Sequence, residues 1–444
     1  MTAVDARAPV DESAVQAAER CISADRLREL VQRIVDVPSP TGEEAPLAAV
    51  LAAELRTAGL DARVQPLDDR QANALGRLRG AGSGPDLLLY APIDTLTTGR
   101  AEDDLPWAGP ELRPDLLPTP RICGDLVVGL GASNPKGHVA CVLAAAEAVA
   151  AAGLPLQGDL LAAFGAGGMP TNALPGPRRA TGQGAGCSFL LEQGGWADMA
   201  VIAKPGWAVS HEEVGLAWLE LRVHGSPTYV GSRHRLPYDN AVAGAAALVL
   251  RLEPWFDQYA GAHTDGLVSP QGVVGAVEGG WTRMPAVTPA VCRVLVDLRL
   301  SPRTGPLQAR RELTAFVDRV AAELGLRVDV ELVLAVPGTT TDPQDWVVRS
   351  AVAAWEHVEG RAHEPQTGTS GATDANILRS RGVPTARIGM PKVPPADLVA
   401  AGLPVDFFSG MNTVSVREMV RLTRHLVRVA VDTLLRDREE VGLP

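Results

Sequence analysis

The spacing of apolar and polar positions follows two different patterns along the chain. Up to about residue 203, stretches with apolar residues at helical spacing alternate with short apolar runs that are typical of buried strands. The expected helices cover 25–37, 43–59, 139–152 and 185–193, and the expected strands cover 61–64, 87–90, 159–164 and 199–203. Residues 1–20 form a loose or helical extension. This alternation predicts an α/β domain whose sheet is mainly parallel and carries helices on its faces.

The pattern of apolar and polar positions changes after residue 214. Strand-like alternation and helical spacing follow one another at 216–223, 240–252, 290–300, 307–324 and 327–333, with room for one more strand before residue 290. This order indicates a small α+β domain of the ferredoxin-like type. The α/β pattern of the first part of the chain then resumes, with expected helices at 345–358 and 416–436 and an expected strand at 385–389. We therefore predict a discontinuous α/β domain of residues 1–214 and 334–444, with an inserted domain at 215–333.

The composition limits the classes of protein to which this chain can belong. The 444 residues are too many for one core, and the net charge of -11 with scattered arginines argues against a nucleic-acid-binding surface. The longest apolar runs are too short to span a bilayer, and the acidic N-terminal stretch is not a signal peptide. Five widely spaced cysteines without a Cys-x-x-Cys pair favour reduced thiols. A cytoplasmic protein that binds neither nucleic acid nor membrane is expected.

Lysine is nearly absent. The chain contains only Lys136, Lys204 and Lys392, and almost all other basic residues are arginines. Because the composition has removed lysine almost everywhere else, these three positions are candidates for a specific role.

Several short segments occur in an informative order. They are Pro38-Ser39-Pro40-Thr41-Gly42-Glu43, Gly131-Ala132-Ser133-Asn134-Pro135-Lys136-Gly137, Gly279-Gly280-Trp281 with Asp297-Leu298-Arg299, and Thr373-Asp374 with Gly382-Val383-Pro384-Thr385. Together they resemble the two-zinc peptidase and deacylase family that includes aminoacylases, acetylornithine deacetylase and succinyl-diaminopimelate desuccinylase. The resemblance covers about residues 25–436. It implies a catalytic α/β domain, an inserted lid and dimerisation domain, a small-molecule substrate and a homodimer.

The resemblance stops at the zinc ligands. The positions that match the five ligands hold Pro92, Asn134 and Lys204, a stretch at 165–174 without any carboxylate, and Asn412. That stretch, after the strand ending at Phe164, should also supply the family's glutamate base. The lid-domain His of the family is Tyr229 here. Proline and a protonated lysine cannot ligate a metal, so we expect the two-zinc site to be lost and no cofactor to be used.

Three of the remaining polar residues form a candidate catalytic centre. Asp94 would orient a ligand His in the family; without that partner it needs a new one such as a lysine, or it caps a turn. Asn134 precedes a proline where the family has an unusual cis peptide, so a cis Asn134–Pro135 bond is expected. Lys204 follows the strand 199–203 at its carboxyl end. It either replaces the metal's positive charge, or acts as a base with lowered pKa, or is a solvated loop residue.

Further polar residues are candidates for substrate binding. They are Lys136, Asn412, Lys392, Tyr229, His234, Arg235, Asn240 and Thr373. For some of them a structural role competes. Lys136 can hold its turn by bonding carbonyls, Asn240 can cap a helix, and residues 229–235 can form a solvated turn.

The favoured function is a metal-independent, hydrolase-like enzyme acting on an amide, imide or other C–N bond of a small polar molecule. Lys204, Asp94 and Asn134 would form its polar centre, and Asn134 and Asn412 could donate to a developing oxyanion. Two alternatives stay open: a non-catalytic ligand-binding or regulatory relative of the deacylases, and a lyase or isomerase on the same fold.

Overall fold

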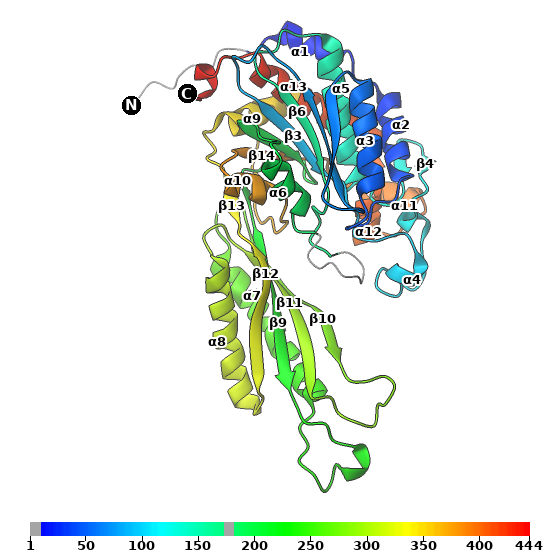
Figure 1. The fold of residues 1–444 in the computed structure, drawn as a ribbon, viewed down its shortest axis with the longest axis vertical. Coiled ribbons are helices and arrows are strands. Elements are labelled where there is room, and N and C mark those ends of the chain that lie inside the picture. The colour runs from blue at the N-terminus through cyan, green and yellow to red at the C-terminus, as the bar shows by residue number, and fades with distance from the viewer. Residues whose placement is uncertain (1–9, 173–181) are drawn as a thin grey trace. The chain divides into compact units, whose positions relative to one another are not determined.

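The computed structural model describes residues 10–172 and 182–444, and the chain forms two compact units (Figure 1). The first unit comprises the described residues up to His211 together with Thr341–Pro365 and Thr373–Pro444. The second comprises Glu212–Thr340 and Gln366–Ala372. Part of the expected extension at 1–20 and the end of the carboxylate-free stretch at 165–174 lie outside the described residues.

The first unit is built on a six-stranded sheet of order β1-β2-β6-β3-β7-β14. Its strands are β1 (Asp61–Pro66), β2 (Ala72–Leu78), β3 (Leu87–Pro92), β6 (Leu160–Gly165), β7 (Met199–Ala203) and β14 (Thr385–Ile388). The pairs among β6, β3, β7 and β14 are parallel, whereas β1 and β2 pair in antiparallel fashion. Strands β3, β6 and β7 are buried along their whole length, which explains their continuous apolar runs.

Helices cover both faces of this sheet (Figure 1). On one face, the sheet shares an apolar core with α1 (Glu12–Glu19), α2 (Ala24–Val35), α3 (Ala45–Thr57), α5 (Lys136–Ala152), α9 (Trp346–Glu359) and α13 (Val416–Leu434). The other packs against α6 (Ala185–Glu192) and α10 (Ala375–Ser380). The predicted fold class, an α/β domain with a mainly parallel sheet, is confirmed.

Short elements complete the first unit. A small sheet of order β15-β5-β4 joins Thr413–Ser415, Leu126–Val128 and Arg121–Cys123. The remaining helices are α4 (Ala101–Asp104), α11 (Pro395–Ala400), α12 (Phe407–Asn412), and the 3-10 turns η1 (Pro114–Leu116) and η3 (Glu439–Val441). In the described part of the chain, no helix is both long and apolar enough to cross a membrane.

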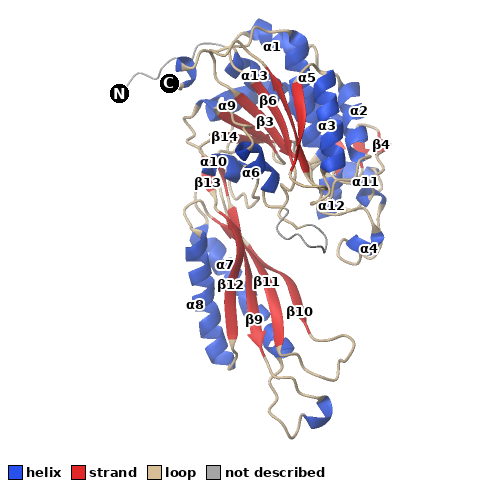
Figure 2. Ribbon diagram, in the orientation of Figure 1, coloured by secondary structure: helices blue, strands red, loops and turns tan. Residues whose placement is uncertain are grey.

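The second unit is a four-stranded antiparallel sheet of order β10-β11-β9-β12 with two long helices (Figure 2). Its strands are β9 (Gly215–His224), β10 (Gly272–Gly279), β11 (Val291–Leu300) and β12 (Val328–Val336). The helices α7 (Ala241–His263) and α8 (Pro306–Leu324) share an apolar core with β9 and β11. The short pair β8 (Glu212–Glu213) and β13 (Thr339–Thr340) and the turn η2 (Val230–Ser232) complete it. Strand β10 fills the place for which the sequence left room before residue 290.

Candidate functional site

Three neighbouring strands of the first unit end at one edge of the sheet. Strand β3 is followed by Asp94, β6 by the loop 166–169, and β7 by Lys204. Because β3 lies between β6 and β7 and is parallel to both, their carboxyl ends lie side by side. Open α/β sheets bind ligands at this edge. Two of the residues proposed from the sequence therefore come together through topology alone.

Asp94 is fully buried and bonded by three donors. Its Oδ2 accepts from Thr41 Oγ1 at 2.6 Å and from the Met169 amide at 3.1 Å, and its Oδ1 accepts from the Gly168 amide at 2.7 Å. Burial raises the pKa of Asp94, while the Thr41 bond, the charge of Lys204 and the two amides act in the opposite direction. Both oxygens bind the loop after β6, so Asp94 fixes the position of this loop.

A second buried carboxyl, Glu44, was not proposed from the sequence. Its Oε1 accepts from the amides of Gly42 at 3.0 Å and Gly167 at 2.9 Å and from Gln71 Nε2 at 3.2 Å. Its Oε2 is buried and has no hydrogen-bond partner among the described residues. Burial, helped by the negative charge of Asp94, raises the pKa of Glu44 to about 8. The sequence signal was an acid at the start of a helix, which is ordinarily a solvated cap.

The loop after β6 presents backbone donors where the family presents glutamates. The amides of Gly167, Gly168 and Met169 all point at Glu44 or Asp94. A β-carbon on Gly168 would lie 2.3 Å from Pro92 Cβ, so the proline packs directly on this loop. The two positions at which the family places a His and a carboxylate are therefore filled by a proline ring and a glycine backbone.

Lys204 carries a buried ammonium at the centre of the group, with 4% of the residue exposed. Its Nζ donates to Asn134 Oδ1 at 3.3 Å and to the Met169 sulfur at 3.5 Å. The Asn134–Pro135 peptide is cis, which confirms the sequence prediction. Lys204 and Asn134, two of the three predicted catalytic residues, thus touch each other.

Helix α12 is hydrogen-bonded to the turn that contains Asn134. The Met411 carbonyl accepts from the amides of Ser133 and Asn134, both at 3.0 Å, and Asn412 Oδ1 accepts from the Gly131 amide at 2.7 Å. The Asn412 Nδ2 donor is buried without a partner in the described part of the chain. A substrate carbonyl could satisfy this donor.

The other two lysines do not join this group. Lys136 is fully buried, and its Nζ donates to the carbonyls of Val35 at 3.3 Å and Val37 at 2.8 Å. Burial lowers its pKa to about 7. This favours the structural alternative over the predicted substrate contact. Lys392 is exposed and lines a different groove, together with Cys123 and Arg417.

The remaining candidates have local partners. Thr373 Oγ1 accepts from the Ala375 amide at the start of α10. Asn240 caps α7 by accepting from the Val242 amide at 3.0 Å, which is the structural alternative. Tyr229 is 53% exposed, and the exposed His234 and Arg235 bond to each other at 2.9 Å. The last four residues belong to the second unit, and their contact with substrate stays a prediction.

The residues at the ligand positions do not fit a two-zinc site. A proline ring offers no lone pair, an ammonium repels a cation, and asparagine is a poor zinc ligand. Among residues 10–172 and 182–444, no group of three or more His, Cys, Asp and Glu side chains could hold a metal ion.

Comparison with known proteins extends the resemblance. No family model matches the chain. Succinyl-diaminopimelate desuccinylase of Stenotrophomonas maltophilia is 26% identical over 369 residues, covering 81% of this chain and 90% of the relative. The structure of human carnosine dipeptidase 1 has a TM-score of 0.69 at 14% identity, covering 96% of this chain and all of that one. A dinuclear metal-binding peptidase of the M20 family from Bacillus subtilis has a TM-score of 0.61 at 12% identity, covering 93% and 98%.

These comparisons correct one prediction. The expectation that no cofactor is used is contradicted, because similar proteins include a dinuclear metal-binding peptidase and a metallo-carboxypeptidase. The sequence similarity to the curated relative and the structural similarity to the dipeptidase each cover most of the chain. The chain is therefore similar to the two-zinc peptidase and deacylase family over most of its length.

Proposed function

We propose that the protein hydrolyses the amide bond of a small N-acyl compound. The similar proteins are named as a desuccinylase, a dipeptidase and a peptidase, and all three names describe cleavage of an amide bond. A metal ion is the cofactor that these relatives imply. Since the residues at the matching positions do not fit the family's site, the proposal assigns roles only to groups of this chain.

The observation that carries the proposal is the buried ammonium of Lys204 beside Asn134. Water screens a buried charge poorly, so an ammonium in this position attracts a carbonyl oxygen or a carboxylate strongly. Positive charge held ready at a carbonyl stabilises the oxyanion that forms when the amide is attacked. Asn412 Nδ2, which has no partner among the described residues, is a second donor, and the side chain is tied to the turn of Asn134 through Gly131. Asp94 and Glu44 hold the loop that carries Met169 against Lys204.

A second candidate function is ligand binding without turnover. Both oxygens of Asp94 are occupied by donors, and residues 165–172 contain no acid that could activate a water molecule. This observation favours the non-catalytic relative considered from the sequence. No described contact favours a lyase or an isomerase.

Release of free amine from N-acyl amino acids tests the proposal. The wild-type protein and Lys204→Met are compared after chelation and again after zinc is added. We expect turnover by the wild type and a loss of about 10²–10³-fold in kcat for Lys204→Met, as for removal of an oxyanion donor. Equal turnover by Lys204→Met would contradict the role of Lys204. Tight binding of the compounds without any turnover in either metal condition would favour the binding protein.

A further inference from the structure

A hollow of about 320 Å³ lies within the first unit, next to the candidate site. We call it the Trp107 pocket; its walls include Thr41, Leu96, Trp107, Thr171 and Phe408. Its volume lies at the lower end of the range for small-molecule sites. It is suited to part of a ligand, such as one ring or a branched chain.

Three elements connect the Trp107 pocket with the Lys204 group. Thr41, in one wall, donates to Asp94 at 2.6 Å. The amide of Thr171 donates to the Met169 carbonyl, and the sulfur of the Met169 side chain lies 3.5 Å from Lys204 Nζ. Phe408 lies on α12, the helix that ends with Asn412. These contacts tie the walls of the Trp107 pocket to the residues around Lys204.

The chemistry of the walls selects the group that can enter. Leu96, Trp107 and Phe408 are apolar, and the threonines are neutral. The two acids in the walls, Asp103 and Asp104, already have partners: Asp104 accepts from the amides of Thr98 and Gly99, and Asp103 pairs with Arg100. No lysine or arginine is among the described residues of the walls. Two of the described wall residues are acids and none is basic, and the neighbouring Arg100 is already paired with Asp103. A carboxylate would therefore gain no new ion pair from these described residues, whereas an apolar group would be buried favourably.

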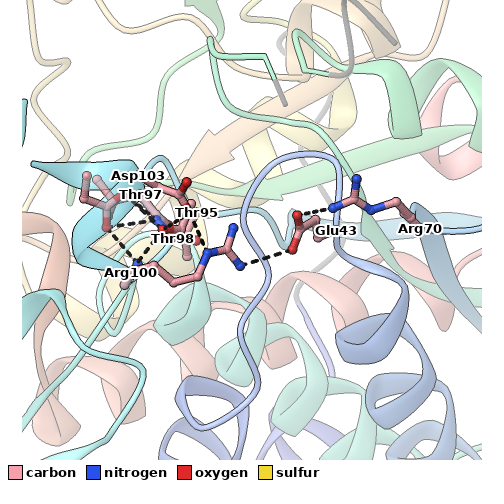
Figure 3. A network of polar contacts seen from close by, with 9 residues as sticks. Glu43, Arg70, Thr95, Thr97, Thr98, Arg100 and Asp103 are labelled. Carbon is pink, nitrogen blue, oxygen red and sulfur yellow. Dashed lines mark hydrogen bonds and ion pairs between the residues drawn. The ribbon is translucent and has the colours of Figure 1, made fainter. Parts of the chain in front are cut away.

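The wall at residues 95–104 is fixed by a network of polar contacts (Figure 3). Thr98 Oγ1 donates to Asp103 Oδ2 at 3.2 Å, and the Arg100 amide donates to Thr98 Oγ1 at 3.0 Å. Arg100 also lies 3.6 Å from Glu43, which pairs with Arg70. Such bracing holds the pocket open before a ligand arrives and lowers the entropic cost of binding.

Trp107 adds an exposed anchor. Its side chain is 84% exposed, although it is the largest apolar group in these walls. An aromatic ring that is open to solvent gains by stacking with an apolar ligand group.

We propose that the Trp107 pocket binds an uncharged aromatic or branched aliphatic group of the substrate and makes the protein selective against acyl groups that end in a carboxylate. Trp107 and Phe408 would be the specificity-determining residues. The inference rests on the proposed function for the position of the substrate carbonyl at Lys204.

Two ligands that differ at one end test this inference by calorimetry. N-(3-phenylpropanoyl)glycine and N-succinylglycine share the glycine and the amide but carry a phenyl ring or a carboxylate at the far end. We expect the wild type to bind the phenyl compound about tenfold more tightly, as burial of one apolar ring predicts. Trp107→Ala and Phe408→Ala should each reduce this ratio by about fivefold. Trp196→Ala, a matched exposed tryptophan before the amino end of β7, should leave the ratio unchanged.

The outcomes separate this inference from the proposed function. A wild-type ratio near one, a preference for the succinyl compound, or a ratio that survives both Trp107→Ala and Phe408→Ala would overturn the pocket assignment. Because Trp107 is exposed, its replacement does not disturb the core. Failure of the proposed function would appear differently, as unchanged amide turnover or binding in Lys204→Met, while the ratio between the two ligands persists.

Discussion

Two buried carboxyl groups beside the loop after β6 are held by backbone amides. Asp94 binds the amides of Gly168 and Met169, and Glu44 binds that of Gly167. The sequence singled out Asp94 but predicted a lysine or a turn as its partner. For Glu44 it offered only an acid at the start of a helix, because the contact with Gly167 joins residues 123 positions apart and leaves no local pattern. Residue identity thus suggested a polar centre, but only tertiary structure showed how its charges are satisfied.

Asp94→Asn tests the loop-holding role of this carboxylate. The new Nδ2 would face a donor and leave at least one buried group unsatisfied. We expect a loss of about 1–3 kcal/mol in the free energy of unfolding. Urea denaturation of the variant measures this, with the exposed Asp69→Asn as control. A stability equal to that of the wild type would show that the amide bonds to Asp94 contribute nothing.

Glu44→Gln should change how stability depends on pH. An ordinary glutamate has a pKa near 4.5, and Glu44 in the folded protein has a pKa of about 8. Between these values the folded protein keeps a proton that the unfolded chain releases, so Glu44 costs stability progressively as pH rises. Glutamine keeps the accepting oxygen without titrating. The stability of Glu44→Gln relative to the wild type should therefore rise between about pH 5 and pH 8.

The measurement is the difference in urea midpoint between the two proteins across this pH range. Other buried groups, such as His138 with its pKa lowered to about 3 by burial, are common to both proteins and cancel in the difference. The exposed Glu102→Gln should show no pH-dependent difference. A difference that is constant with pH would contradict the raised pKa of Glu44.

At the scale of elements, the carboxyl ends of the strands bring the site residues together. Close contacts between backbone segments then hold them in place. The continuous apolar runs of β3 and β7 were visible in the sequence, because strands buried on both faces show no alternation. Their order in the sheet was not visible, since it depends on long-range pairing. The loop after β14 shows how tight the fit is: a β-carbon on Gly389 would lie 1.7 Å from the Lys204 carbonyl oxygen and 2.8 Å from His138 Nε2.

Gly389→Ala should therefore displace the backbone of Lys204. We expect a loss of about 1–3 kcal/mol or more in stability, because backbone and a packed imidazole must shift. Gly261→Ala in α7 is the control: its β-carbon would meet nothing within 4 Å, and alanine should stabilise the helix by up to about 1 kcal/mol. Thermal denaturation of both variants compares them. A Gly389→Ala variant as stable as the control would contradict the close packing at Lys204.

At the scale of the molecule, the sequence predicted the α/β fold and its approximate course. It missed the small sheet β15-β5-β4, because strands of three residues carry no readable periodicity. It also missed that Gln366–Ala372 belongs to the second unit, where Thr369 bridges to Val268. Both features depend on contacts between distant segments.

The homodimer implied by the family resemblance is a prediction at this scale. The edge strands β10 and β12 carry exposed apolar side chains, Val277 at 52% and Val333 at 53%. Such edges favour pairing with another strand. Sedimentation equilibrium should give about twice the chain mass of 46.5 kDa, and Val277→Lys or Val333→Lys should weaken the association. A single species at the chain mass would refute the dimer.

The central claim is that the buried ammonium of Lys204 forms the binding centre of this site. Its most direct test is the affinity for N-(3-phenylpropanoyl)glycine, measured by calorimetry in the wild type, Lys204→Met and Lys392→Met. The account predicts that Lys204→Met weakens binding by about tenfold or more, the value of a hydrogen bond to a charged group. Lys392→Met, a change of the same kind on an exposed side chain in another groove, should stay within about twofold of the wild type. Wild-type affinity in Lys204→Met would contradict the account.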